Sequence, residues 1–287
     1  MENDSNIIGI YHKNCNDGTT AAAVLLTKFP DAKVYPLDHG YTESDLLPIL
    51  EKIIPNLKVY TIDCCLGVPE ILKVGAFVTT IDHHISVKNE MEAISKKNDH
   101  FTFIFDNDKS GASLAWKYFF PNSPTPRLIE LVEDCDLWTE KYGNDTKSIA
   151  HYLTRFLNDP KKIIPLLINL PQNILDEGAS LSLFEELLIQ QFLANNNPTK
   201  LSIGTHYVPA YNSPFFKSEL GSILSERHGS VVCIFNIKGD VVRLSFRSKN
   251  EQNPSAKDIA KILGGGGHKN AAGARVTLNE FKKLIIE

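Results

Sequence analysis

The triplet Asp82-His83-His84 closes an apolar run, "AFVTTIDHH", where a predicted strand meets a loop. Asp and His are metal ligands, and other apolar segments are followed by the same residue types: His12 and Asp17, Asp63, Asp134 and Asp136. The carboxyl ends of parallel strands gather along one crevice of an α/β sheet. We therefore predict a site for two divalent metals, a kind of site that hydrolyses phosphate esters.

Two metals about 3.5–4 Å apart can activate one water and hold the attacking and leaving oxygens. Asp63 is the predicted bridging ligand because it ends a predicted central strand. His12 and Asp17 would serve one metal, and His83 and Asp136 the other. Taken singly, each residue has a simpler explanation, such as a turn, a helix cap or a buried histidine. The joint pattern favours the metal site.

The remaining members of the triplet have supporting roles in this hypothesis. Asp82 would orient His83 or a neighbouring group, because a ligating imidazole needs a partner for its second nitrogen. In an extended segment His84 points the other way. It is then free to contact phosphate or to protonate a leaving group.

A run of four glycines near the carboxyl-terminal end, "KILGGGGHKNAAG", is the second chemical feature. A helix C-cap uses one glycine, whereas consecutive glycines let backbone N–H groups approach an anion. The predicted phosphate cradle consists of Gly265, Gly266, Gly267, His268, Arg247 and Arg243, the two arginines lying on one strand face at an even spacing. The alternative is a flexible turn between a helix and a strand.

Ser110, in "DNDKSGASLAW", is predicted to cap a helix whose N-terminus could also favour a phosphate oxygen.

The aromatic residues Trp116, Phe119, Phe120 and Trp138 are expected in the core rather than as stacking platforms for bases.

Charge divides unevenly along the 287 residues. Residues 1–198 hold 17 Lys+Arg and 27 Asp+Glu, whereas residues 199–287 hold 13 and 7. An acidic first part suits metal cations and a basic second part suits anionic substrates. An acidic lobe also counts against long duplex DNA as a partner.

No apolar run approaches the ~20 residues of a membrane span, and the polar start "MENDSN" does not resemble a secretory signal, so we expect a cytoplasmic protein. The five cysteines fit free thiols in a reducing compartment. Four of them lie within two residues of a proposed ligand and could recruit zinc: Cys15, Cys64, Cys65 and Cys135.

Strand and helix patterns alternate over residues 1–157, which predicts βαβ units and a parallel sheet. Residues 158–198 have helical periodicity broken by Pro and Gly and are interpreted as a helical connector. Residues 199–287 restart with strands, "KLSIGTHYVPAY", "SVVCIFNIKG" and "DVVRLSFRS", and predict a smaller α+β domain with helices at 214–227 and 255–263. The predicted active-site cleft lies between the two lobes.

Four segments resemble, in order and spacing, the motifs of the DHH phosphoesterase superfamily: "HKNCNDGTTAA", "TID" at 61–63, "TTIDHH" and "EDCDLW". "LSFRS" and "GGGGHKNAAG" resemble the DHHA1-type substrate-binding domain of one branch. That branch includes single-strand exonucleases, oligoribonucleases and cyclic-dinucleotide phosphodiesterases. The resemblance covers nearly the whole chain apart from 158–198.

The resemblance implies two Mn²⁺ ions, with Mg²⁺ or Co²⁺ as alternatives, held by the five ligands His12, Asp17, Asp63, His83 and Asp136. It implies that His84 contacts phosphate or acts as general acid, so that His84, Asp63 and His83 are the catalytic residues. Asp136 is preferred to Asp134 because the family Asp stands two residues before the Trp. Asp82, Asp134 and Asn14 are further candidate ligands.

Asn14 stands where related chains carry Asp. A neutral carbonyl oxygen lowers the affinity for a dication, which predicts one weaker metal site.

The predicted function is metal-dependent phosphodiester hydrolysis of short single-stranded oligonucleotides or small cyclic dinucleotides by a monomer or homodimer. Three alternatives remain: a pyrophosphatase or nucleotide phosphomonoesterase with the same site, a nucleotide-binding sensor that has lost activity because of Asn14, and a structural nucleic-acid binder. Neither a membrane nor long duplex nucleic acid is an expected partner.

Overall fold

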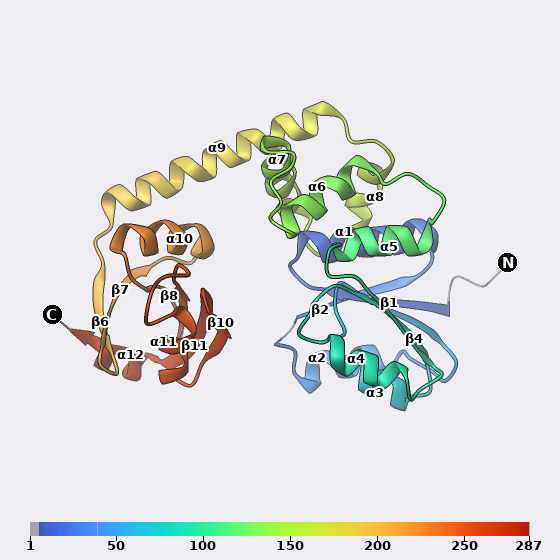
Figure 1. Cartoon of the computed structure of the whole chain (residues 1–287), viewed down its shortest axis with the longest axis horizontal. Helices are drawn as coiled ribbons and strands as arrows, with labels where there is room; N and C mark the ends of the chain where they lie inside the picture. Colours follow the sequence, from blue (N-terminus) through green and yellow to red (C-terminus); the bar gives the residue numbers. More distant parts are fainter. Residues whose placement is uncertain (1–5, 39, 287) are drawn as a thin grey trace. The chain divides into compact units, whose positions relative to one another are not determined.

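The computed structural model describes residues 6–38 and 40–286. The chain divides into two compact units, the first ending at Leu183 and the second beginning at Phe184. Each unit has its own sheet and its own buried core (Figure 1).

The first unit contains a sheet of five parallel strands in the order β2-β1-β3-β4-β5. The strands are β1 (Ile7–His12), β2 (Lys33–Leu37), β3 (Lys58–Ile62), β4 (Phe77–Asp82) and β5 (Phe101–Phe105). Their apolar runs are typical of strands that are covered on both faces. The strand order reverses between β1 and β3, and ligands of such sheets bind at the carboxyl ends beside this point.

Helices cover both faces of this sheet (Figure 1). One face carries α1 (Asn16–Lys28), α5 (Gly111–Phe119), α6 (Arg127–Asp136), α7 (Asn144–Leu153) and α8 (Pro160–Ile168). The other carries α2 (Glu43–Leu50), α3 (Val68–Lys73) and α4 (Lys88–Ser95). The small residues Ala21, Ala22 and Ala23 of α1 are fully buried, which lets neighbouring helices pack closely against it.

The long helix α9 (Gln172–Asn195) contributes to both cores. Its Ile174 and Leu175 belong to the core of the first unit and its Ile189 to that of the second. α8 likewise packs into the core of the first unit through Ile163 and Leu167. The predicted connector 158–198 is therefore helical, and its helices are parts of the two cores.

The second unit contains a seven-stranded sheet in the order β10-β11-β9-β8-β7-β6-β12, in which β7 and β8 are parallel and the other pairs antiparallel. The strands are β6 (Thr199–Ile203), β7 (His206–Asn212), β8 (Val232–Lys238), β9 (Val241–Arg247), β10 (Gly266–His268), β11 (Ala271–Thr277) and β12 (Ile285–Ile286). α11 (Ala256–Ile262) and α12 (Leu278–Leu284) pack on one face, and α10 (Lys217–His228) packs on the other.

This architecture confirms the predicted fold class, a parallel α/β unit followed by a smaller α+β unit. Some local predictions were wrong. "KLSIGTHYVPAY" is two strands rather than one, because Gly204 (φ +61°) makes the turn between β6 and β7. Trp138 is 85% exposed rather than part of the core.

Candidate metal centre

His12 and Asp17 lie on either side of the turn that joins β1 to α1. His12 is the last residue of β1, and Asp17 is in the first turn of α1, where its carboxylate is buried. The Asp17 oxygens accept hydrogen bonds from the backbone N–H groups of Gly111 (2.6 Å) and Ala112 (3.0 Å) at the start of α5. The partial positive charge of that helix N-terminus favours the carboxylate, so Asp17 is fixed in position by α5.

Asp63 lies at the centre of the cluster. It directly follows β3 with a left-handed backbone (φ +57°) and is almost completely buried. Its Oδ2 lies 3.4 Å from His12 Nδ1, and its Oδ1 lies 3.2 Å from His83 Nε2. Among the described residues, both Asp63 oxygens and His83 Nε2 are buried without a well-formed hydrogen bond. Buried polar atoms of this kind are costly unless another group binds them, and a divalent cation fits this donor set.

Two glycines allow the chain to approach Asp63 closely. A Cβ on Gly111 would lie 2.5 Å from the Asp63 Cβ, and a Cβ on Gly18 would lie 3.1 Å from Asp63 Oδ2 and 2.5 Å from the His12 carbonyl oxygen. Neither Gly18 nor Gly111 is among the site residues predicted from the sequence. The sequence did offer a signal for each: Gly18 directly follows the candidate ligand Asp17, and Gly111 directly follows the helix cap Ser110.

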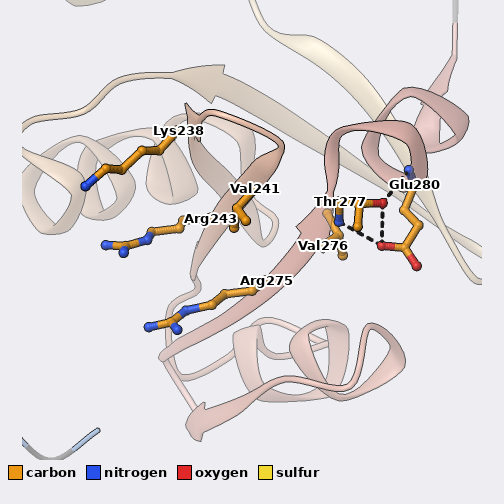
Figure 2. A pocket seen from close by; sticks show the side chains of 7 residues that line it. All are labelled: Lys238, Val241, Arg243, Arg275, Val276, Thr277 and Glu280. Atoms are coloured by element: carbon orange, nitrogen blue, oxygen red, sulfur yellow. Dashed lines mark hydrogen bonds between the residues drawn. The ribbon is translucent and has the colours of Figure 1, made fainter. Parts of the chain in front are cut away.

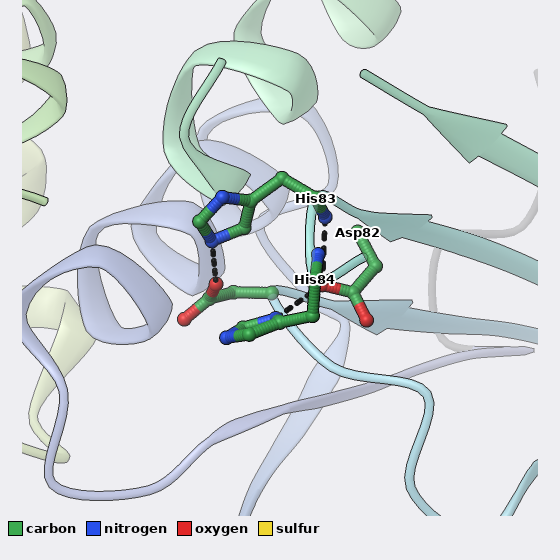
Figure 3. A group of neighbouring side chains, drawn as sticks. Asp82, His83 and His84 are labelled. Carbon is green, nitrogen blue, oxygen red and sulfur yellow. Dashed lines mark hydrogen bonds and ion pairs between the residues drawn. The ribbon is translucent and has the colours of Figure 1, made fainter. Parts of the chain in front are cut away.

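Asp82 contacts both histidines that follow it (Figure 3). It is the last residue of β4, and its Oδ1 accepts a hydrogen bond from the His83 N–H (2.7 Å) and lies 2.7 Å from His84 Nδ1. The two imidazole rings are 4.5 Å apart between centroids. The expectation that His84 points away from His83 was wrong: the strand ends at Asp82, so its alternation of side chains does not continue to His84.

Asp136, the last residue of α6, completes the cluster. Its Oδ2 lies 3.5 Å from His83 Nε2. Within the described part of the chain, three sets of side chains offer ligand atoms within 4.8 Å of one another: Asp17, His83 and Asp136; His12, Cys15 and Asp63; and Asp63, Asp82, His83 and His84. Asp63 and His83 each belong to two of these sets, so the geometry is compatible with neighbouring metals that share a ligand.

The pKa values of the carboxylates differ because their neighbours differ. Burial, and then the charges of Asp63 and Asp136, raise the pKa of Asp17 well above its ordinary value. Burial would also raise the pKa of Asp63, but His12, His83 and His84 lower it to about 2. Burial and the charge of Asp63 raise the pKa of Asp136. Crowded carboxylates of this kind repel one another, and a bound cation would relieve the repulsion.

The pKa values of both histidines of the triplet are raised by neighbouring carboxylates. The hydrogen bond to Asp82 raises the pKa of His84 to about 9. Burial lowers the pKa of His83, but Asp63 and Asp136 raise it overall. A protonated His84 would suit contact with phosphate or proton donation.

Asp134 does not join the cluster, and its candidacy as a ligand was wrong. Its carboxylate accepts hydrogen bonds from the N–H groups of Lys141 (2.7 Å) and Tyr142 (3.1 Å) and from the hydroxyls of Thr139 and Thr146. Both oxygens are therefore occupied, and the residue fixes the segment between α6 and α7.

Ser110 is also unsuited to its predicted contact with substrate. It is completely buried, and its hydroxyl accepts a hydrogen bond from the Ser113 N–H (3.3 Å) as the N-cap of α5. The first free N–H groups of that helix bind Asp17, so neither the cap nor the helix N-terminus is available to a phosphate.

Asn14 is held by a second asparagine. Its Oδ1 accepts a hydrogen bond from Asn158 Nδ2 (2.7 Å), and its backbone N–H donates to Asn158 Oδ1 (2.8 Å). Both residues have left-handed backbones, φ +58° and +65°. The candidate ligand oxygen of Asn14 is therefore neutral and already hydrogen-bonded.

Among the cysteines, Cys15 is the one that shares a ligand set with His12 and Asp63. Burial, followed by the charges of Asp63 and Asp17, raises the pKa of its thiol. Cys64 is fully buried in the apolar core, and its Sγ lies 3.8 Å from the Ile10 carbonyl oxygen. Of the four cysteines that could recruit zinc, Cys15 is therefore the one that the geometry favours.

Part of the glycine run in the second unit forms a strand and not the predicted phosphate cradle. Gly264 (φ +73°) follows α11, and Gly266–His268 form the edge strand β10. A Cβ on Gly265 would lie 2.1 Å from the Gly273 carbonyl oxygen, and one on Gly267 (φ +138°) would lie 2.6 Å from Ala272 Cα. The alternative of a flexible turn was wrong, because Gly266 and Gly267 pair with β11 and Gly265 and Gly267 approach its backbone closely. Gly266 alone of the four has open space around its Cβ position and an ordinary φ.

The predicted basic residues lie on one face of this sheet. Arg247 is opposite Ala271, which is in turn opposite His268, so the two basic residues share a cross-strand row. Arg247 is partly held already, because its Nη2 donates to Ser218 Oγ (3.0 Å) and its Nη1 to the Phe246 carbonyl oxygen (3.0 Å). Arg243 lies on the same strand face and lines a hollow of about 520 Å³ (Figure 2).

Comparisons with known proteins bear on the fold and on the carboxyl-terminal domain. Residues 217–287 match the DHHA1 domain family. The chain is 28% identical over 289 residues to the uncharacterized protein R106 of Acanthamoeba polyphaga mimivirus, covering 92% of the chain and 66% of that protein's length.

Two solved structures share the arrangement of elements. The exonuclease RecJ bound to manganese has a TM-score of 0.56 at 17% identity, with 97% of this chain and 88% of that chain covered. A pGpG-specific phosphodiesterase, PggH from Vibrio cholerae, has a TM-score of 0.53 at 13% identity, with 96% and 95% covered. The chain shares its fold with these two structures. Its carboxyl-terminal part is a DHHA1 domain, as the sequence motifs predicted.

In the part of the chain that the structure describes, no helix combines the length and the apolar character that crossing a membrane requires.

Proposed function

We propose that the protein is a metal-dependent phosphoric ester hydrolase that cleaves phosphodiester bonds in short single-stranded oligonucleotides or small cyclic dinucleotides. The observation that carries this proposal is the buried carboxylate of Asp63, which lies between His12 and His83 with no hydrogen bond to either oxygen among the described residues. Its fold is shared with an exonuclease and a phosphodiesterase.

The residues that would hold two divalent metals are His12, Asp17, Asp63, His83 and Asp136. Mn²⁺ is the proposed metal, with Mg²⁺ or Co²⁺ as alternatives; the RecJ structure of similar fold contains manganese. When bound, such metals supply an activated water and offset the charge of the phosphate. Asp17 is oriented by the N-terminus of α5 and Asp63 by the turn after β3, so both are positioned before metal binds.

The chain's own residues would bind the substrate and move a proton. His84, which Asp82 orients through its Nδ1, would contact a phosphate oxygen or protonate the leaving oxygen. Arg247 and His268, on one row of the second unit's sheet, would bind a phosphate of the substrate. The net positive charge of this half favours an anionic oligomer over a small anion such as pyrophosphate.

A second candidate function, a nucleotide-binding sensor, is favoured by one observation. The Asn14 oxygen is neutral and hydrogen-bonded by Asn158, so one metal position would lack a carboxylate. Such a protein would bind nucleotides and hydrolyse none.

The test is to incubate the purified chain with Mn²⁺ and a labelled RNA dinucleotide, a pentanucleotide, a cyclic dinucleotide or pyrophosphate. Asp63→Asn removes the central charge, and Asp108→Asn, an exposed residue of the same unit, is the matched control. Hydrolysis that is lost only in Asp63→Asn supports the proposal and identifies the substrate. Saturable binding without turnover supports the sensor. Undiminished hydrolysis by Asp63→Asn contradicts the site assignment.

A further inference from the structure

A basic hollow lies on the second unit's sheet, away from the row that holds Arg247 and His268. Lys238, Arg243 and Arg275 line it, and their side chains extend side by side in one direction (Figure 2). Arg243 and Arg275 are directly opposite each other on β9 and β11, and both are exposed. Like charges in this position destabilise a sheet, so the arrangement favours a bound anion.

The acidic residues near the hollow do not neutralise these cations. Glu280 lines it, but its carboxylate accepts the N–H (2.7 Å) and hydroxyl (2.9 Å) of Thr277 as part of the cap of α12. Among the described residues, no carboxylate forms an ion pair with Lys238, Arg243 or Arg275. The three cations therefore form an open positive patch.

Arg243 and Arg275, which line the hollow, are on the same face of the sheet as the Arg247 row. Arg243 and Arg247 are four residues apart on β9, which corresponds to about 13 Å along a strand. The row between them consists of Ser245, Gly273 and Gly266, whose side chains are small or absent. α10 packs over the neighbouring strand β8, where Val232 and Ile234 are buried, and leaves Gly266, Arg243 and Arg275 exposed.

We propose that this hollow is an outer phosphate subsite for a single-stranded oligonucleotide. This inference rests on the proposed function and extends it. A separation of about 13 Å is too long for one phosphate, so the Arg247 row and the Arg243–Arg275 row would bind different phosphates of one strand. The small middle row gives the sugar and base between them room to pass. Longer oligonucleotides are then better substrates than dinucleotides, which reach only one of the two rows.

The double variant Arg243→Gln/Arg275→Gln tests the subsite in the full-length chain. Lys257→Gln/Lys261→Gln is the matched control, because it removes the same charge from α11, which packs on the opposite face. The first measurement is fluorescence anisotropy of a labelled single-stranded heptanucleotide in EDTA at several salt concentrations. The second is kcat/KM with Mn²⁺ for a dinucleotide and for the heptanucleotide.

The expected result is about tenfold weaker heptanucleotide binding in the double variant, with a salt dependence shallower by roughly 0.7–1.4 in the log–log slope, which corresponds to one or two lost phosphate contacts. Its kcat/KM falls for the heptanucleotide and not for the dinucleotide, and the control variant behaves as wild type.

An equal loss for both lengths, or no loss for either, overturns the subsite. The subsite is also overturned if Arg243→Gln/Arg275→Gln keeps heptanucleotide binding and loses binding to phosphatidylserine vesicles, because the hollow would then bind lipid phosphate. If the wild type hydrolyses no oligonucleotide, the proposed function fails. The anisotropy measurement still decides the subsite, because it needs neither metal nor turnover.

Discussion

Asn14 and Asn158 form a reciprocal pair in which each side-chain oxygen accepts a hydrogen bond from the other residue. The pair places a neutral amide at position 14, where the resemblance to the DHH motif leads us to expect a carboxylate. The Asn158 backbone carbonyl also accepts a hydrogen bond from the Tyr11 hydroxyl (3.2 Å), and its N–H donates to Thr19 Oγ1 (3.2 Å). Asn14 is thus supported from outside the cluster, and this support does not require an amide at position 14.

The first prediction is that Asn14→Asp strengthens metal binding. A carboxylate oxygen still accepts the hydrogen bond from Asn158 Nδ2, and Asp tolerates the left-handed backbone nearly as well as Asn. The added charge should lower the Mn²⁺ concentration for half-maximal activity by about tenfold. Titration of activity with Mn²⁺ measures this, with Asn16→Asp as a nearby control. An unchanged Mn²⁺ requirement would mean that position 14 does not face the metals.

The second prediction separates the two acids of "EDCDLW". Asp134→Asn should destabilise the fold by about 2 kcal/mol, because an amide cannot accept from all four donors that Asp134 satisfies. Asp136→Asn should weaken metal binding with little loss of stability, since burial and Asp63 already raise the pKa of Asp136. Urea unfolding and Mn²⁺ titration of both variants check this, and the reverse pattern would contradict the assignment.

Asp134 should also make the stability of the fold depend on pH. Burial would raise the pKa of Asp134, but its hydrogen bonds from Thr139, Thr146, Lys141 and Tyr142 lower it to about 2. The unfolded value is near 3.9, so the carboxylate's contribution to stability is complete above about pH 4 and is lost as the pH falls through about 2. The difference in unfolding free energy between wild type and Asp134→Asn should therefore shrink over that range. A constant difference would exclude this linkage.

The third prediction concerns metal selectivity. A thiolate favours zinc over manganese, and Cys15 shares a ligand set with His12 and Asp63. Cys15→Ser should weaken Zn²⁺ binding by about an order of magnitude and change Mn²⁺ binding less. Calorimetric titration with each metal measures this, with Cys65→Ser as the control. Equal Zn²⁺ affinities in all three proteins would remove Cys15 from the site.

Sequence reasoning located most of the cluster because one physical rule connects pattern to position. Apolar runs predict the strands of a parallel sheet, and their carboxyl ends meet at one edge, so His12, Asp63 and His83 come together without knowledge of any side-chain contact. The distinction between Asp134 and Asp136 came from the motif resemblance, and the structure supplies its physical reason in the four hydrogen bonds that Asp134 accepts.

Other features depend on contacts between segments distant in sequence, which no local pattern encodes. β10 exists because Gly266 pairs with Gly273, and glycines carry no alternation that would predict a strand. His84 turns back because Asp82 binds it, whereas period-two reasoning assumes that the strand continues. Trp138 was expected in the core as an aromatic residue, but it follows α6 with a left-handed backbone (φ +55°) and is exposed.

The fourth prediction tests the close approach of α5 to the metal centre. Gly111→Ala places a Cβ 2.5 Å from the Asp63 Cβ, so α5 or Asp63 has to move, and the hydrogen bonds from Gly111 and Ala112 to Asp17 are disturbed. Alanine has the higher helix propensity, by about 1 kcal/mol, so any loss reflects this steric conflict. We expect a destabilisation of about 1–3 kcal/mol together with weaker Mn²⁺ binding. Gly40→Ala is the control, because its Cβ would meet nothing within 4 Å. Thermal unfolding with and without Mn²⁺ measures both effects, and a Gly111→Ala variant with wild-type stability and Mn²⁺ affinity would show that α5 does not set the position of Asp63.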